Sequence, residues 1–131
     1  MHSQFKTLMV TAFIAALCSC GPEVVPSSGP HSPTSVDDVK IYQKKPSKYE
    51  DLGLLTLAIT PDLAWDANGD ANAAFDRLKA QAAALGANGL LLDVDPSNYD
   101  ILTQAGYHGV FYDVPMKNKT AFNEAIFVLK E

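Results

Sequence analysis

Apolar and polar positions alternate along two early stretches of the chain, residues 39–43 and 52–60. Alternation with a period of two is typical of half-buried strands. The second stretch ends at Pro61, since proline cannot donate a hydrogen bond within a sheet. Its main apolar face holds Leu55, Leu57 and Ile59. The pattern therefore predicts two strands before residue 61.

Helical spacing replaces alternation between residues 71 and 85. Apolar side chains recur three and four positions apart, at Ala71, Ala74, Phe75, Leu78, Ala82 and Leu85. This spacing predicts one amphipathic helix. We expect Asp70 to be its N-cap. Gly86 should end the helix, because glycine readily adopts the left-handed conformation that closes a last turn.

The stretch at residues 90–94, which is apolar except for Asp93, predicts a buried strand. Strand 52–60, the helix and this strand form a βαβ unit, which predicts two parallel strands with a right-handed crossover. Residues 107–114 alternate and predict a further strand. The last segment, 121–130, fits a helix or a strand, and its Ile-Phe-Val run favours a strand. The expected fold is α/β (α+β), with a mixed sheet of four to five strands and one main helix on one face.

The first twenty residues have the pattern of a targeting segment. Lys6 precedes an apolar run of ten residues, 8–17. This run is too short to cross a bilayer, which takes about 20 residues, but it suits a secretory signal. Two cysteines follow it, at positions 18 and 20. They are too close for an easy mutual disulfide, and the chain has no third cysteine for a metal site.

The run Leu17-Cys18-Ser19-Cys20 resembles a bacterial lipobox, with leucine three residues before the modified cysteine and a small residue just before it. The resemblance implies that residues 1–19 are a cleaved signal peptide and that lipid on Cys20 anchors the protein to a membrane. Plain secretion and an uncleaved anchor remain the alternatives. Gly21 is not the aspartate that retains lipoproteins at the inner membrane in enteric-type sorting, so we expect the outer membrane of the bacterial envelope.

Residues 20–35 hold four of the eight prolines, with several serines. Such a composition predicts an extended tether, followed by one domain at 36–131. The whole chain carries a net charge of −5 and has no basic run beyond Lys44–Lys45. Nucleic acid is therefore not an expected partner, because phosphate neutralisation needs a basic face.

Two acidic residues are the only candidate ligand pair for a small molecule or metal. Asp93 and Asp95 lie two apart at the end of a predicted parallel strand and should point to the same face. They could equally be solvated charges that lead into a turn. Asp66, Asn68 and Asp70 have the spacing of a calcium loop, but Ala71 and Arg77 replace its required glycine and acid. We expect an Asx-rich turn there.

Aromatic residues in the predicted strand 107–114 are the candidate partner surface. If the strand is continuous, Tyr107 and Phe111 share one face and Tyr112 lies on the other. We expect Tyr107 and Phe111 to be exposed to an envelope protein partner and Tyr112 to face the core. His108 is the only histidine after residue 31, and the chain has neither a G-x-S-x-G turn nor a glycine-rich phosphate loop. No enzyme activity and no cofactor are expected.

Three pieces of the chain, "VKIYQKKPSKYEDLGLLTL", "AFDRLKAQAAALGANGLLLDV" and "AIFVLK", resemble the small domains of RcsF-type envelope lipoproteins and YbjQ-like domains. The resemblance implies a small α/β fold in the envelope. RcsF-type sensors depend on core disulfides, and the mature chain keeps no cysteine beyond Cys20. The expectation is a non-enzymatic interaction or sensory lipoprotein. The alternative is a periplasmic domain that binds a small ligand or a metal.

Overall fold

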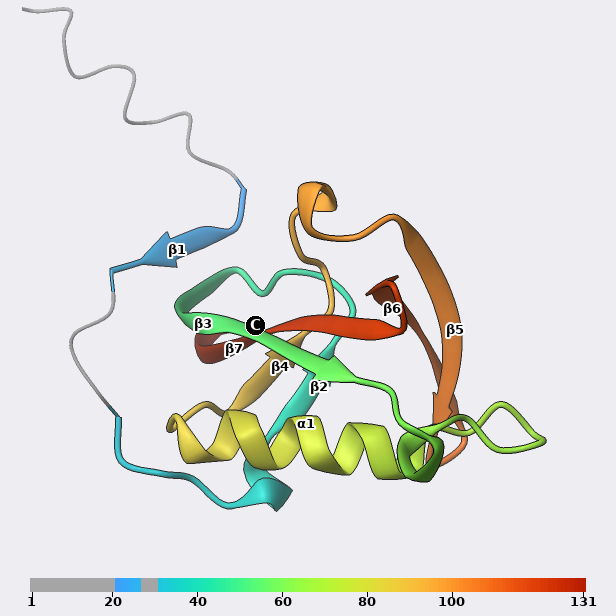
Figure 1. The fold of residues 1–131 in the computed structure, drawn as a ribbon. Coiled ribbons are helices and arrows are strands. Elements are labelled where there is room, and N and C mark those ends of the chain that lie inside the picture. Colours follow the sequence, from blue (N-terminus) through green and yellow to red (C-terminus); the bar gives the residue numbers. More distant parts are fainter. Residues whose placement is uncertain (1–20, 27–30) are drawn as a thin grey trace, which may run out of the picture.

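The computed structural model describes residues 21–26 and 31–131 and contains seven strands and one α-helix in those ranges (Figure 1). Cys18 and Cys20 lie outside the described residues. The strands and the helix are β1 Glu23–Val25, β2 Lys40–Tyr42, β3 Lys48–Ala58, α1 Asn72–Ala84, β4 Gly89–Leu91, β5 Ile101–Tyr107, β6 Val110–Lys117 and β7 Thr120–Lys130. Three 3₁₀ turns lie at Val36–Asp38, Pro61–Leu63 and Pro96–Asn98. The α+β class, the mixed sheet and the single helix are confirmed, whereas the expected sheet of four to five strands was too small.

The long strand β7 is the centre of the sheet. β3 pairs antiparallel along one of its edges, and the other edge is shared by β6 at Thr120–Ala121 and β4 at Glu124–Ile126. β1 extends the sheet beyond β3, and β2 extends it beyond β4. Both β3 and β4 oppose β7, so they run in the same direction but do not touch. The parallel direction expected for the two strands of the βαβ unit is confirmed, but the strands are not neighbours, because β7 lies between them.

Two tight turns join β5, β6 and β7 into a meander. His108 and Gly109 form the first, with φ of 49° and 84°, and Asn118 and Lys119 form the second, with φ of 52° and 60°. Two central residues with positive φ make the type of hairpin turn whose twist matches antiparallel strands. The strand expected at 107–114 is confirmed only from Val110 onward, because the chain reverses at His108 and Gly109 and places Tyr107 at the end of the preceding strand. The strand favoured for the last segment is confirmed.

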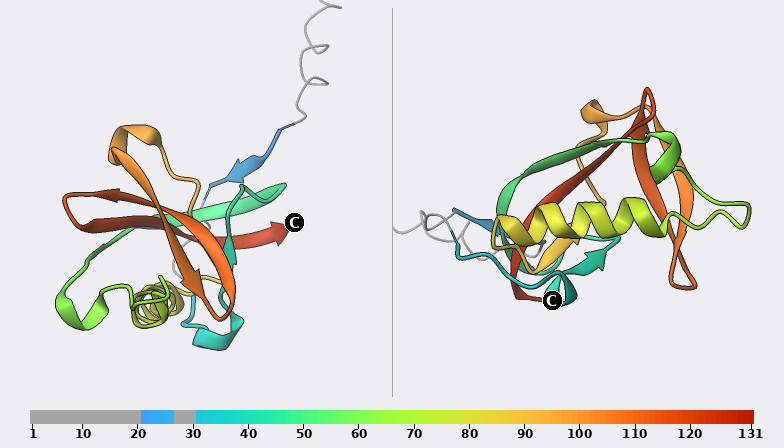
Figure 2. Two further views of the ribbon diagram at one scale, coloured as in Figure 1. Left: turned by 90° about the vertical axis from the view of Figure 1, so that its right-hand side faces the viewer. Right: turned by 60° about the horizontal axis from the view of Figure 1, so that its bottom comes forward.

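The helix packs on the concave side of the curved sheet, which Figure 2 shows in the view along the helix axis. The main core between them includes the buried residues Leu57, Ala74, Phe75, Leu78, Ala82, Leu90, Ala105, Val114 and Ala125. The predicted cap was wrong: the N-cap is Ala71, which makes no side-chain capping bond. Asp70 instead forms an isolated bridge with Gly106 on β5. The predicted stop at Gly86 is confirmed, with φ of 82° and its N–H donated to the carbonyl of Ala83.

Part of the segment assigned to a tether packs against the domain. β1 pairs in parallel with the first residues of β3. Thr34 donates its backbone N–H to the carbonyl of Ala83 at 2.9 Å, at the end of α1. The His31 Nε2 lies 3.0 Å from a carboxylate oxygen of the buried Glu50, and its ring stacks on Phe127 with centroids 4.5 Å apart. We call residues 31–34 the arm; it closes the core beyond the C-terminal end of the helix.

One polar side chain lies unpartnered in the core. Asn123 is fully buried on β7 opposite Leu55, and neither its amide nitrogen nor its oxygen has a hydrogen-bond partner among the described residues. Asn123 lies between the part of β7 that pairs with β6 and the part that pairs with β4. A buried amide without a partner costs about 1–3 kcal/mol.

Replacing Asn123 by leucine, which has the same branched shape but no polar atoms, should therefore raise the free energy of unfolding by about 1 kcal/mol. Asn88→Leu is the matched control. Its amide accepts a bond from the N–H of Val128 at 2.7 Å and donates one to that residue's carbonyl, so this variant should lose stability. Urea unfolding curves of both variants give the comparison. A loss of stability in Asn123→Leu as large as that in Asn88→Leu would contradict the claim that the buried Asn123 amide has no hydrogen-bond partner.

Candidate functional site

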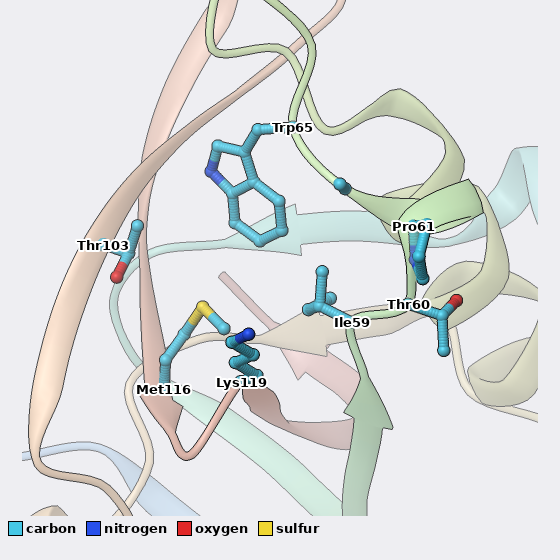
Figure 3. Close-up of a pocket in the computed structure, with 8 residues that line it drawn as sticks. Ile59, Thr60, Pro61, Trp65, Thr103, Met116 and Lys119 are labelled. Carbon is cyan, nitrogen blue, oxygen red and sulfur yellow. The ribbon is translucent and has the colours of Figure 1, made fainter.

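An apolar cleft opens between the end of β3, the turn that follows it and the β5–β6 hairpin. Its volume is about 460 Å³. Figure 3 shows the side chains around it, with Trp65 facing Met116 and Ile59 across the opening. The lining residues come from four separate segments: Ile59, Thr60, Pro61, Ala64, Trp65, Thr103, Met116 and Lys119. None of them was among the site residues expected from the sequence.

Hydrogen bonds between the walls hold the cleft open. The indole Nε1 of Trp65 donates to the carbonyl of Gln104 on β5 at 3.1 Å. The backbone N–H of Ile59 donates to the carbonyl of Lys119, in the β6–β7 turn, at 2.8 Å. Pro61 begins the 3₁₀ turn that redirects the chain after β3. These hydrogen bonds connect the loop that carries Trp65 to β5 and the end of β3 to the β6–β7 turn, so the segments that line the cleft are fixed relative to one another.

The polar groups of the cleft lie at its margin. In Figure 3 the amine of Lys119 extends upward beside Met116. Lys119 forms no ion pair among the described residues. The Thr60 hydroxyl donates to the carboxylate of Asp62, and this bond is the main reason that the pKa of Asp62 is lowered. The lining itself contains one ionisable side chain, Lys119, and no carboxylate.

A second cavity of about 300 Å³ lies between the end of β7 and β2. Three of its polar side chains already pair with one another. Glu131 accepts bonds from the Lys40 amine at 3.0 Å and the Tyr42 hydroxyl at 2.9 Å. The hydrogen bond from Lys40 is the largest cause of the lowered pKa of Glu131. The first cleft is the better candidate because it is larger and its lining is mostly apolar.

The structure does not bring Asp93 and Asp95 together into a ligand site. β4 ends at Leu91, so both aspartates lie in the loop beyond the strand, and both are exposed. The Asp95 carboxylate accepts the N–H of Ser97 at 3.0 Å, as the cap of the short turn Pro96–Asn98. Its pKa is lowered mainly by that backbone bond. Across residues 21–26 and 31–131, no group of three histidine, cysteine or acidic residues has the arrangement of a metal site.

Asp93 instead influences a carboxyl on the neighbouring strand. The pKa of Glu124, on β7, is raised to about 7. Burial is the largest cause, followed by a hydrogen bond and repulsion from Asp51 on β3 and by the charge of Asp93. Lys45 opposes these effects. The carboxyl group of Glu124 is therefore protonated in the folded protein at a pH where it is ionised in the unfolded chain.

This shift predicts that stability falls as the pH rises. The pKa of Glu124 in the folded protein lies above the ordinary value of 4.5. Its contribution to the free energy of unfolding is therefore fully present below about pH 4.5 and is lost by about pH 7. Because solvent screens a partly buried group, we expect the free energy of unfolding to fall by about 1–2 kcal/mol across this pH range. Glu124→Gln should remove this decrease. Urea unfolding at pH 5 and pH 8 tests this: an equal loss on raising the pH in both proteins would exclude Glu124 as the cause.

The exposure expected for the two aromatic residues of the candidate partner surface is confirmed for one of them and wrong for the other. Phe111 is 54% exposed, as predicted, but Tyr107 is buried at 8%, so its assignment to the surface was wrong. The Tyr107 hydroxyl donates to Asp76 at 2.7 Å. Burial and then this bond raise the pKa of Tyr107 well above its usual range. Tyr112 packs against Phe75 with ring centroids 5.6 Å apart, which confirms that it faces the core.

The calcium-like stretch is the Asx turn that the sequence predicted. The Asp66 carboxylate accepts the N–H groups of Asn68 at 2.8 Å and Asp70 at 2.9 Å. His108, the lone histidine of the later chain, lies exposed in the first hairpin turn. Within the described part of the chain, no helix combines the length and the apolar character needed to cross a bilayer.

Comparison with protein-family models, with curated proteins and with solved structures finds no match for this chain. The sequence held one signal for the cleft: the only tryptophan of the chain follows a proline that ends a strand. The facing residues Thr103, Met116 and Lys119 had no such signal, because the two hairpin turns bring them there.

Proposed function

We propose that the protein is a lipid-anchored, non-enzymatic protein of the bacterial envelope whose domain binds an apolar group in the cleft. The observation that supports binding is the cleft itself. Its volume of about 460 Å³ lies within the range of small-molecule sites, about 300–1,000 Å³, and such sites are mostly apolar with a few polar groups. Its lining lacks a pair of groups for acid–base catalysis, which favours binding over chemistry.

The position of the anchor supports the same proposal. Cys20, the residue that the lipobox resemblance marks for lipid, lies three residues before β1, a distance of at most about 10 Å. β1 pairs with β3 at Lys48, whereas the cleft begins at Ile59, after the other end of the same strand. A strand of this length spans roughly 33 Å. The proposed anchor thus holds one end of the domain near the membrane while the cleft opens at the far end.

The only tryptophan lines the cleft, so its fluorescence tests binding. We expect 1-decanol to shift the emission of Trp65 in a saturable way. Ala64→Phe places a large side chain at an exposed lining position and should abolish the shift. Ala58→Phe, on an exposed position of β3 outside the lining, is the matched control and should bind normally. Equal shifts in both variants would show that the alcohol binds elsewhere.

The proposed anchor has a separate test. Cys20→Ser should leave an unprocessed precursor or a protein that no longer fractionates with membranes, because Cys20 is the group proposed to carry the lipid. Cys18→Ala should behave like the original protein. Membrane fractionation with mass measurement of the product distinguishes the outcomes. Lipid-modified, membrane-bound Cys20→Ser protein would refute the anchor.

A further inference from the structure

We propose that the ligand of the cleft is an amphiphile with a single anionic head group, whose apolar chain lies against Trp65 and whose head pairs with Lys119. This inference rests on the proposed function, since it names the class of ligand for the same cleft. The shared chemistry is a flexible apolar chain that ends in a carboxylate or a comparable monoanion.

The lining determines the shape of the apolar part. Ile59 and Pro61 form one wall, and Met116 forms part of the other, with the Trp65 ring at one end (Figure 3). Methionine adapts to irregular apolar partners. At about 30 Å³ for each water-sized group, 460 Å³ has room for about fifteen non-hydrogen atoms. This is the size of a medium-length alkyl chain with its head group.

The positive charge of Lys119 at the margin of the cleft favours an anionic head group. Lys119 is held at the cleft by its own backbone, because its carbonyl accepts the N–H of Ile59. Its side chain belongs to the lining, and no described residue neutralises it. Asp62 follows the lining residue Pro61 in sequence but is not part of the lining, and its carboxylate already accepts the Thr60 hydroxyl.

These charges discriminate among three otherwise similar ligands. An anionic head gains the attraction of Lys119. A neutral head gains only the apolar contacts, and a cationic head meets repulsion at the margin. An anionic ligand also has to approach a chain with a net charge of −5. The preference for an anion must therefore come from the local cation and not from the overall field of the protein.

The test compares decanoate, 1-decanol and decyltrimethylammonium at pH 7, below their micelle-forming concentrations, with Trp65 emission as the measurement. We expect Lys119→Gln to weaken decanoate binding about fivefold, the effect of one exposed ion pair. The same variant should leave decanol binding unchanged. Lys117→Gln removes an exposed lysine outside the lining and should alter neither affinity. Added salt should weaken decanoate binding to the original protein but not to Lys119→Gln.

The outcomes separate this inference from the proposed function. If Lys119→Gln binds decanoate as well as the original protein does, or if Lys117→Gln loses as much affinity, the anionic assignment is wrong while the cleft remains a binding site. Tighter binding of the cationic amphiphile than of decanoate would also overturn it. If none of the three compounds shifts Trp65 emission, the proposed function itself fails.

Discussion

Replacing Gly86 by alanine is expected to lower the free energy of unfolding by about 3 kcal/mol and to detach the arm, residues 31–34. Gly86 ends α1 with φ of 82°, a conformation that costs an L-residue about 1–2 kcal/mol. An added Cβ would clash with the Cβ of His31 and lie 2.8 Å from the carbonyl oxygen of Ser32. The arm must move away, which breaks the contacts of His31 with Glu50 and Phe127.

Gly109→Ala is the matched control for this prediction. Gly109 has nearly the same φ, 84°, but an added Cβ there has nothing within 4 Å. It should cost about 1–2 kcal/mol from backbone strain alone. Urea unfolding measures the two losses, and limited proteolysis reports cleavage in the arm. Equal losses in the two variants, or an arm that stays protected in Gly86→Ala, would show that the arm adds little to the fold.

Tyr107→Ala should destabilise the domain by about 3–4 kcal/mol, whereas Phe111→Ala should cost less than about 1 kcal/mol. Tyr107 is buried, its ring lies 5.0 Å from that of Phe75, and its hydroxyl bonds to Asp76. The alanine variant leaves a cavity beside the helix and removes the partner of that carboxylate. Phe111 lies on the outer face of the same hairpin and is mostly exposed.

Thermal and urea unfolding of the two variants, measured side by side, test the orientation of the hairpin. Tyr107→Phe separates the two contributions, because it keeps the ring and removes only the hydrogen bond to Asp76. We expect it to cost about 1 kcal/mol. A larger loss in Phe111→Ala than in Tyr107→Ala would mean that the two faces of the hairpin are reversed.

Short stretches of the sequence were enough to predict the helix, the glycine that ends it and the last strand. The apolar spacing from Ala71 to Leu85 matches α1, and Gly86 ends the helix as glycine commonly does. The strand at the end of the chain followed from its β-branched and aromatic run. These features depend on propensity and periodicity within a short window, so they can be predicted without knowledge of the tertiary contacts.

The hairpin shows how such a pattern can mislead. Residues 107–114 alternate regularly, but His108 and Gly109 adopt positive φ and reverse the chain. Tyr107 then pairs with Val110 across the turn, and Phe111 pairs with Gly106. Directly paired residues share a face of a sheet, so Tyr107 and Phe111 lie on opposite faces. The histidine–glycine pair was the missed turn signal, because histidine tolerates the left-handed region better than most residues.

The sheet order and the cleft depend on contacts between distant segments. β7 lies between β3 and β4 because its long apolar strand can pair on both edges, and the sequence does not rank that pairing above a direct β3–β4 contact. The cleft combines residues 59–65 with Thr103, Met116 and Lys119. The two hairpin turns, the Trp65–Gln104 bond and the bond from Ile59 to Lys119 bring these residues together, so the cleft had no local signature.

The most direct test of the central proposal, a ligand cleft at the end of the domain far from the anchor, is a map of amide and indole NMR shifts during titration with decanoate. We predict that the largest changes occur at the Trp65 indole and at the amides of Ile59, Thr103 and Lys119. Changes centred on Tyr42 and Asn88, which line the second cavity, or on the exposed Phe111 would contradict the proposal, and so would a titration that shifts no signal.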